Sequence, residues 1–140
     1  PWQAYVFGCQ VAEVEVDTVT GEVQVLGIWA AHDVGRAGNP KGVEGQIEGA
    51  VHMGLGYARS EEFPADDQGR PTHMTLRSLA IIRPKDMPPV EVILGESPQP
   101  DSPYGILGVG EIGLVPSAGA VAAALHARDG QWRNRLPMSV

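Results

Sequence analysis

Several features that would narrow the function of this 140-residue chain are missing from it. A single cysteine, Cys9, allows no disulfide within the chain, which fits a reducing compartment and leads us to expect a cytoplasmic protein. A lone cysteine is most often a small buried apolar residue, so we expect Cys9 to be buried. No apolar run approaches the roughly 18–20 residues that a membrane span needs, and no signal-peptide pattern opens the sequence.

Positive charge is also scarce. The chain has 10 lysine and arginine residues against 17 aspartate and glutamate residues, and the basic residues are scattered along it. Because binding to a phosphate backbone needs clustered basic groups, we expect no nucleic-acid partner. The sequence also lacks the spacings of metal sites, nucleophile elbows and phosphate-binding loops, so we predict no metal ligand in this chain.

The composition that remains is that of a folded domain. Hydrophobic residues make up 43% and charged residues 19%, which predicts one globular domain at most for a chain of this length. The 18 glycines and 12 prolines are spread along the chain, which indicates many tight turns. The chain begins at Pro1 without a methionine and partway into an expected strand, so we expect a fragment or a processed subunit of something larger.

Residues 5–34 alternate in the way of a half-buried strand that turns back on itself. Ala12, Val14 and Val16 fall on one face and acidic residues on the other. Residues 18–22 supply a turn, so we predict a β-hairpin over 5–34. The hairpin ends at His32 and Asp33. These could form an acid–base pair, but neighbours in a strand point to opposite faces, and we favour a structural role for both.

A helix is expected over residues 39–60. Asn39 followed by Pro40 is typical of a helix cap and first turn. The apolar residues recur at helical spacing and predict a core-facing stripe of Val43, Ile47, Ala50, Val51 and Ala58.

Glycines form a second stripe on the same expected helix, although each costs roughly 0.8–1 kcal/mol relative to alanine. Such a face lets another backbone or a flat ligand come close. Gln46 lies beside this stripe and offers both a donor and an acceptor to a bound group, or is simply solvated. The stripe consists of Gly42, Gly45, Gly49 and Gly56.

The second half of the chain alternates short elements with breakers. We expect an exposed loop over 61–72, strands over 74–82 and 90–94, and a stiff extended segment over 97–103. A helix from Pro116 to Arg128 should end near Gly130, and a closing strand is expected over 132–136. Its buried face should hold Ala118, Val121, Ala122 and Leu125. The predicted fold class is therefore α+β, with a hairpin and short strands packed against two main helices.

The stretch from Tyr104 to Gly113 carries the most suggestive chemistry. It places one carboxylate, Glu111, in a glycine-rich turn just before a helix. The apolar residues that follow would tend to raise the pKa of this carboxyl group and suit it to proton abstraction. We therefore predict a turn-and-helix unit over 104–128 with Glu111 as its catalytic residue.

Taken in order, these segments resemble the C-terminal end of the molybdopterin-binding subunit of the molybdenum hydroxylases, the xanthine dehydrogenase and aldehyde oxidase family. The match covers nearly the whole chain, and although each motif is weak alone, their shared order is specific. The segments are Val11–Ala31, Ala31–Pro40, Val43–Ala50, Gly54–Tyr57, Asp86–Pro88, Gly108–Glu111 and Leu136–Met138.

The resemblance implies a role for three residues. Glu111 matches the family's general base, which takes the proton from a molybdenum-bound hydroxide as that group attacks an aldehyde or a purine-like N-heterocycle. Gln46 matches a glutamine that lies against the molybdenum cofactor, and Gly110 a glycine that lets backbone approach the pterin. The resemblance further implies molybdopterin, in its cytosine dinucleotide form. The implied partners are the remainder of the molybdopterin-binding subunit and the domains or subunits that carry 2Fe-2S and FAD centres.

Two other functions remain to be weighed. The chain could be a non-catalytic assembly module that docks the cofactor-holding chain through the glycine-striped helix. A stand-alone hydrolase that uses Glu111 is disfavoured, because the sequence offers no convincing second catalytic group.

Overall fold

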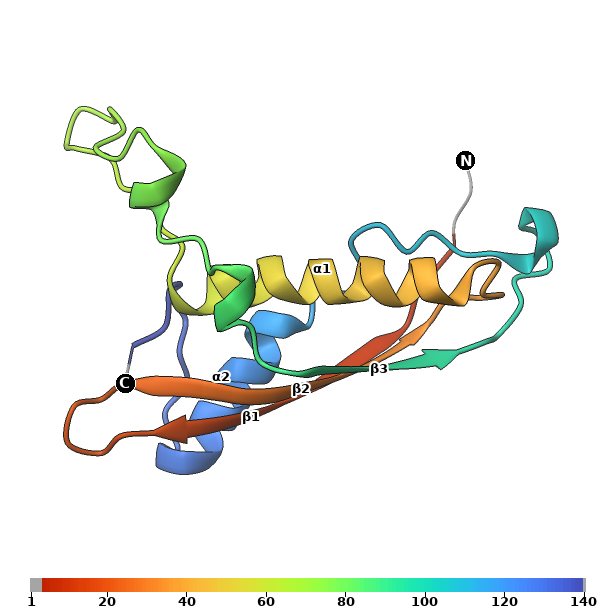
Figure 1. Ribbon diagram of the computed structural model, residues 1–140, viewed down its shortest axis with the longest axis horizontal. Coiled ribbons are helices and arrows are strands. Elements are labelled where there is room, and N and C mark those ends of the chain that lie inside the picture. The colour runs from red at the N-terminus through yellow and green to blue at the C-terminus, as the bar shows by residue number, and fades with distance from the viewer. Residues whose placement is uncertain (1–3, 140) are drawn as a thin grey trace.

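The computed structural model describes residues 4–139, in which a three-stranded sheet carries two α-helices on one of its faces (Figure 1). Strand β1 (Gly8–Val16) pairs antiparallel with β2 (Val23–Asp33), and β2 pairs parallel with β3 (Val90–Gly95). Helix α1 (Pro40–Arg59) lies between β2 and β3 in the chain, and α2 (Ser117–Asp129) follows β3. Short 3-10 helices occupy Leu76–Leu79, Pro84–Asp86 and Pro103–Gly105. The expected α+β class is confirmed.

The hairpin is built as the alternation predicts, with one irregularity. Glu13 pairs with Gly27 and Val14 with Val25, so Leu26 is an extra residue in β2. Such a bulge changes which residues of the strand point inward. Odd-numbered residues such as Val23 are buried before the bulge, and Ile28, Ala30 and His32 are buried after it. The bulge explains why the sequence of β2 loses its alternation near residue 26.

Cys9 is exposed, and the expectation that it is buried is wrong. The reason is the register of β1. Gln10 is buried and Ala12 and Val14 are half-buried on the inward face, so the residue before Gln10 must point outward. The inward position next to Cys9 belongs to a glutamine instead of an apolar residue.

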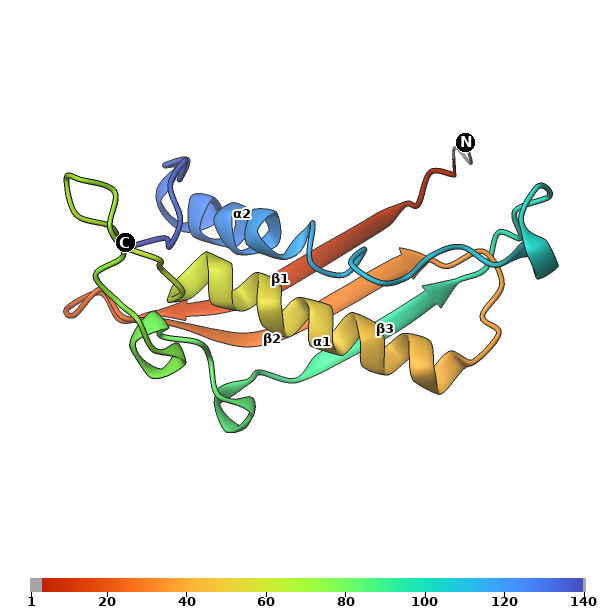
Figure 2. The same ribbon diagram turned by 90° about the horizontal axis from the view of Figure 1, so that it is seen from above.

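Helix α1 begins as its sequence predicts, because the Asn39 side chain accepts a hydrogen bond from the Gly42 amide and Pro40 occupies the first turn. Of the predicted core stripe, Ile47, Ala50, Val51 and Ala58 are buried and Val43 is half-buried. Figure 2 shows α1 lying across β2 and β3 with α2 beside it over β1.

The start of α2 packs closely against α1 at Gly54, which is not in the predicted glycine stripe. A Cβ atom at Gly54 would lie 2.4 Å from the Ser117 Cβ atom and 3.0 Å from the Leu114 carbonyl oxygen. The missing side chain therefore lets the start of α2 rest directly on α1. By contrast, nothing lies within 4 Å of a Cβ atom built at Gly45 or Gly49.

Two of the predicted strands are wrong. Residues 76–79 form a 3-10 helix, because Thr75 and Ser78 make a reciprocal capping box at its start. Residues 132–136 form no strand, since Trp132 stacks on His126 with ring centroids 4.0 Å apart and Arg133 pairs with Asp129 at 2.6 Å. These contacts bind the segment to the end of α2. The expected start of a strand at residues 1–3 lies outside the described residues.

The sheet face away from the helices is open in the part of the chain that the structure describes. Val11 and Trp29 are register partners on this face, and Ile93 lies on it in β3. All three are among the exposed large apolar residues. Acidic residues share this face, since Glu13 lies on it in β1 and Glu91 accepts a hydrogen bond from the Trp29 indole at 2.9 Å. The open face is therefore a mixture of apolar and acidic side chains.

Candidate functional site

The segment that leads to Glu111 is fixed to the end of β2. The Leu107 amide donates to the Val34 carbonyl at 3.1 Å, and the Arg36 amide donates to the Gly105 carbonyl at 2.9 Å. Between them Gly35 adopts a φ of +68°, and a Cβ atom there would lie 2.5 Å from the Gly105 oxygen. Only glycine fits this position without strain. These contacts fix the position of the backbone just before the 108–111 turn.

Asp33 also stabilises the end of β2, by joining it to the segment that follows β3. Its Oδ1 atom accepts hydrogen bonds from the Gly35 amide at 3.0 Å and the Ser97 amide at 3.1 Å. These bonds, the Gly35 amide first, lower the pKa of the Asp33 carboxyl group. Asp33 and His32 form no hydrogen bond with each other among the described residues, as the strand geometry predicts. The structural role that the sequence favours for both stays a prediction.

Gln46 and the Gly110 turn come together. The Gln46 Nε2 atom donates to the Gly110 carbonyl oxygen at 2.8 Å, although 64 residues separate them. The resemblance implies that each of them lies against the cofactor, and here they contact each other directly. The Gln46 side chain is exposed. The predicted cofactor-binding residues thus lie side by side next to Glu111.

The Glu111 side chain is exposed rather than enclosed. Val115 points outward and is also exposed, and Gly113 has no side chain to offer. The apolar surroundings that the sequence predicts for this carboxylate are therefore absent from residues 4–139. The backbone around it is nevertheless ordered into a turn, since the Leu114 amide donates to the Glu111 carbonyl at 3.1 Å.

Behind the turn lies a buried polar cluster that no sequence motif indicates. Gln10 Nε2 donates to the Gly113 carbonyl at 2.7 Å, and the Ser117 hydroxyl donates to Gln10 Oε1 at 2.7 Å, with the Gly113 carbonyl also within reach at 2.9 Å. The Nε2 atom of His32 lies 3.2 Å from Gln10 Nε2. Gln10, His32 and Ser117 are all buried. The one signal in the sequence is a glutamine at an inward position of β1, on the same face of the strand as Ala12 and Val14.

Burial lowers the pKa of His32 below its ordinary value of 6.5. The unfolded chain therefore binds a proton near pH 6.5 while the folded chain remains neutral to lower pH. Stability is full above pH 6.5 and is lost as the pH falls from there toward the lowered pKa. We expect urea unfolding of the chain to give a smaller free energy at pH 5.5 than at pH 7.5, with a weaker dependence in His32→Gln. An equal dependence in both proteins would contradict this assignment.

Neither a metal cluster nor a membrane helix is found among residues 4–139. No three or more His, Cys, Asp or Glu side chains gather there in a way that could hold a metal ion. No helix in the same residues is long and apolar enough to cross a membrane.

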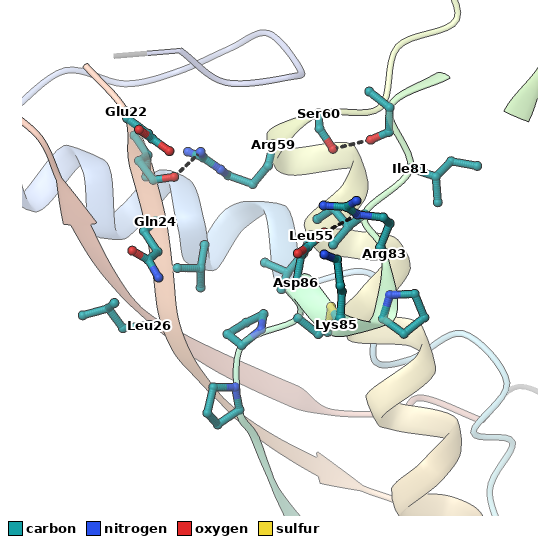
Figure 3. A pocket seen from close by; sticks show the side chains of 18 of the residues that line it. Glu22, Gln24, Leu26, Leu55, Arg59, Ser60, Ile81, Arg83, Lys85 and Asp86 are labelled. Atoms are coloured by element: carbon teal, nitrogen blue, oxygen red, sulfur yellow. Dashed lines mark hydrogen bonds and ion pairs between the residues drawn. The ribbon is translucent and has the colours of Figure 1, made fainter. Parts of the chain in front are cut away.

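A groove lies at the far end of α1 from the Glu111 turn (Figure 3). Its volume is about 1350 Å³, and it runs between β2, the end of α1 and residues 76–89. The Arg59 side chain donates to the Val23 carbonyl within it, and Arg83 pairs with Asp86 at 2.6 Å. None of the three predicted site residues lines this groove, so it is separate from the candidate site.

Comparison with known proteins identifies the family. Residues 1–88 match the family model described as a molybdopterin cofactor-binding domain. The chain is 39% identical to a probable xanthine dehydrogenase protein of Bacillus subtilis, over 96% of this chain and 18% of that protein. It is 33% identical to the aldehyde oxidoreductase of Megalodesulfovibrio gigas, over 98% of this chain and 15% of that protein.

Solved structures agree with the sequence relatives. The crystal structure of quinoline 2-oxidoreductase from Pseudomonas putida 86 superposes with a TM-score of 0.78 and 36% identity, over 82% of this chain and 15% of that one. The aldehyde oxidoreductase from Desulfovibrio gigas superposes with a TM-score of 0.85 and 33% identity, over 94% of this chain and 14% of that one.

The chain spans less than a fifth of the length of the relatives it matches. Within that span the match runs through both halves of the candidate site, since it covers nearly all of this chain. The family that the order of sequence motifs predicts is confirmed. The chain belongs to the molybdopterin cofactor-binding domain family of the xanthine dehydrogenase and aldehyde oxidoreductase large subunits.

Proposed function

We propose that this chain is the part of a molybdenum hydroxylase that supplies the general base, Glu111, and that Gln46 and Gly110 contact the molybdopterin. The observation that carries the proposal is the direct bond between Gln46 Nε2 and the Gly110 carbonyl. It puts an exposed carboxylate beside the two residues for which the family resemblance implies cofactor binding. Exposure fits this role, because a proton acceptor must be reachable by the group that reacts.

The backbone of the turn fits an anionic, oxygen-rich cofactor. Within residues 4–139, no group accepts a hydrogen bond from the amides of residues 108–111. Cβ atoms built at Gly108 and Gly110 would meet nothing within 4 Å, whereas Val109 packs toward the core. Successive free amides between glycines can approach phosphate or pterin oxygens closely. We infer that these amides and Gln46 hold the molybdopterin, in its cytosine dinucleotide form.

The reaction we propose is hydroxylation of an aldehyde or a purine-like N-heterocycle with oxygen from water. When bound, the molybdenum cofactor accepts the two electrons that leave the substrate, and 2Fe-2S and FAD centres on partner domains or subunits carry them away. A Glu111 carboxylate oxygen accepts the proton of the water-derived nucleophile. The Glu111 carboxylate becomes neutral, and the oxygen that loses the proton becomes a stronger nucleophile toward the reacting carbon.

Two open surfaces favour the alternative function, an assembly module. The face of α1 at Gly45 and Gly49 is open, and so is the face of the sheet that carries Trp29. Both faces could dock the chain that holds most of the cofactor. Docking and catalysis are compatible, so the alternative differs only in giving Glu111 no chemical role.

Two variants of the complete enzyme separate these functions. Under our proposal Glu111→Gln abolishes substrate hydroxylation while the molybdenum and pterin content stays near that of the wild type. Under the alternative Glu111→Gln is silent, and Gly45→Leu prevents co-purification with the cofactor-holding chain. Metal analysis and a substrate-dependent dye-reduction assay distinguish them. Hydroxylation retained in Glu111→Gln would rule out the proposal.

A further inference from the structure

We propose that Gln10 and Ser117 are positioning residues, which lock the backbone of the Glu111 turn from its buried side. The inference rests on the proposed function of Glu111 as the base. Glu111 lies between two carbonyl groups that side chains from distant elements hold in place. Gln46 of α1 holds the Gly110 carbonyl, and Gln10 of β1 holds the Gly113 carbonyl.

The buried anchor is doubled. The Ser117 hydroxyl reaches both the Gly113 carbonyl and the Gln10 side-chain oxygen. Gln10 is 8% exposed and Ser117 is fully buried, so water cannot replace either bond. A buried polar group without a partner costs about 1–3 kcal/mol. Any slip of the turn that broke these bonds would therefore be unfavourable.

The orientation of the Gln10 amide is itself fixed. Its nitrogen faces both the Gly113 carbonyl and His32 Nε2, and its oxygen accepts from Ser117. A rotated amide would turn its oxygen toward the Gly113 oxygen, which is repulsive. Gly8 makes room for this arrangement, because a Cβ atom there would lie 2.3 Å from His32 Nδ1. The Gln10 amide thus has one orientation that satisfies both of its polar atoms, while His32 Nδ1 is buried without a hydrogen-bond partner among the described residues.

Close packing supports the same turn. A Cβ atom at Gly113 would lie 3.0 Å from the Ala50 Cβ atom and 3.1 Å from the Ile47 carbonyl oxygen. The Gly113 backbone therefore rests on α1 while its carbonyl is held by β1 and α2. Contacts from three elements meet at the residue two positions after Glu111.

This anchoring matters because the Glu111 carboxylate has no hydrogen-bond or salt-bridge partner within residues 4–139. Because no side-chain contact fixes the carboxylate, its position depends on the position of the backbone of the turn. A displacement of about 1 Å at a reacting group can cost on the order of 100-fold in rate. The buried cluster accordingly affects kcat through the position of Glu111, without contacting substrate or cofactor.

The test uses the complete enzyme carrying Ser117→Ala, Gln10→Leu or both. We expect kcat to fall about 10- to 100-fold with KM within about twofold, because the substrate does not contact these residues. The Leu114 amide donates to the Glu111 carbonyl and the Ser117 amide to the Leu114 carbonyl, both within the turn. Loosening of the turn weakens these two bonds, so hydrogen exchange of the peptide that spans residues 108–118 should rise at least about tenfold. The double variant should behave like the single ones, because the two side chains act as a unit.

Matched controls remove similar groups elsewhere. Ser60→Ala deletes a hydroxyl that donates to the Ala80 carbonyl at 2.7 Å, and Gln24→Leu replaces an exposed glutamine of β2. Both should leave kcat and exchange of the 108–118 peptide unchanged. Should Gln10→Leu fail to fold, Ser117→Ala still tests the inference, because it removes one oxygen atom only.

The outcomes separate this inference from the proposed function. Full turnover in Glu111→Gln would reject Glu111 as the base and, with it, the positioning role. Loss of turnover in Glu111→Gln together with wild-type kcat and exchange in Ser117→Ala would overturn the positioning role alone. Faster exchange without any change in kcat would also overturn it, since the cluster would then be structural only.

Discussion

Replacing Glu111 with glutamine is expected to lower kcat of the complete enzyme by at least about 100-fold. Glutamine keeps the size and exposure of the side chain but cannot accept a proton at neutral pH. The backbone of the turn should not change, since the bonds to Gly110 and Gly113 involve carbonyl groups and not the Glu111 side chain. The loss therefore reports chemistry rather than folding, and steady-state kinetics on enzyme of known molybdenum content measures it.

The shorter acid separates the need for a carboxylate from the need for its position. Glu111→Asp keeps the proton acceptor and withdraws it by one methylene, so we expect a kcat between those of the wild type and Glu111→Gln. Glu15→Gln, an exposed change on β1, should leave kcat unchanged. If Glu111→Asp were as inactive as Glu111→Gln, precise placement would be shown to matter as much as basicity. A fully active Glu111→Gln would contradict the assignment.

Much of the scaffold could be predicted because local signals decide it. Asn39 and Pro40 start α1 through a cap that needs no distant partner, and the alternation of Ala12, Val14 and Val16 sets the inward face of β1. The strand over residues 90–94 is also confirmed, as β3. By contrast, residues 74–82 have strand-like composition but pair with no strand of the sheet, and the Thr75 capping box sets the conformation of residues 76–79 instead.

The candidate site was predictable only in part. The order of motifs in the sequence singles out Gln46, Gly110 and Glu111, but a hydrogen bond across 64 residues depends on the packing of α1 against the turn. Gln10 carried no motif at all. Its role follows from the β1 register, which turns it inward, and from Ser117 at the start of α2 meeting it there. The sequence pattern alone could not predict the hydrogen bond between Gln10 and Ser117.

Helix α1 uses its glycines in two different ways, which explains why the predicted stripe was only partly informative. Gly54 faces inward, where the start of α2 leaves no room for a side chain. Gly45 and Gly49 face outward into open space in the described residues, so nothing in this chain requires them to be glycine. Their conformational cost of roughly 0.8–1 kcal/mol each is therefore not offset within the chain. This favours a function outside it, such as contact with the cofactor or with the remainder of the subunit.

The two kinds of glycine should respond oppositely to the same substitution. Gly49→Ala is expected to stabilise the 140-residue chain by about 0.8–1 kcal/mol, because alanine is the better helix former and its methyl group meets nothing. Gly54→Ala gains the same propensity but forces the Ser117 Cβ atom, 2.4 Å from the new methyl, to move. Overpacking of this kind typically costs about 1–3 kcal/mol. We therefore expect Gly54→Ala to unfold at a lower urea concentration than Gly49→Ala.

A second measurement distinguishes overpacking from a general loss of helix. If Gly54→Ala displaces Ser117, the exchange changes should centre on the 108–118 turn, because Ser117 and Gly113 are bonded there. A Gly54→Ala protein as stable as Gly49→Ala, with unchanged exchange in that turn, would mean that α2 does not rest on α1 as described. Gly49→Ala in the complete enzyme provides the complementary result. Lost cofactor or lost assembly there, beside a stabilised isolated chain, would place the missing contact at the open face of α1.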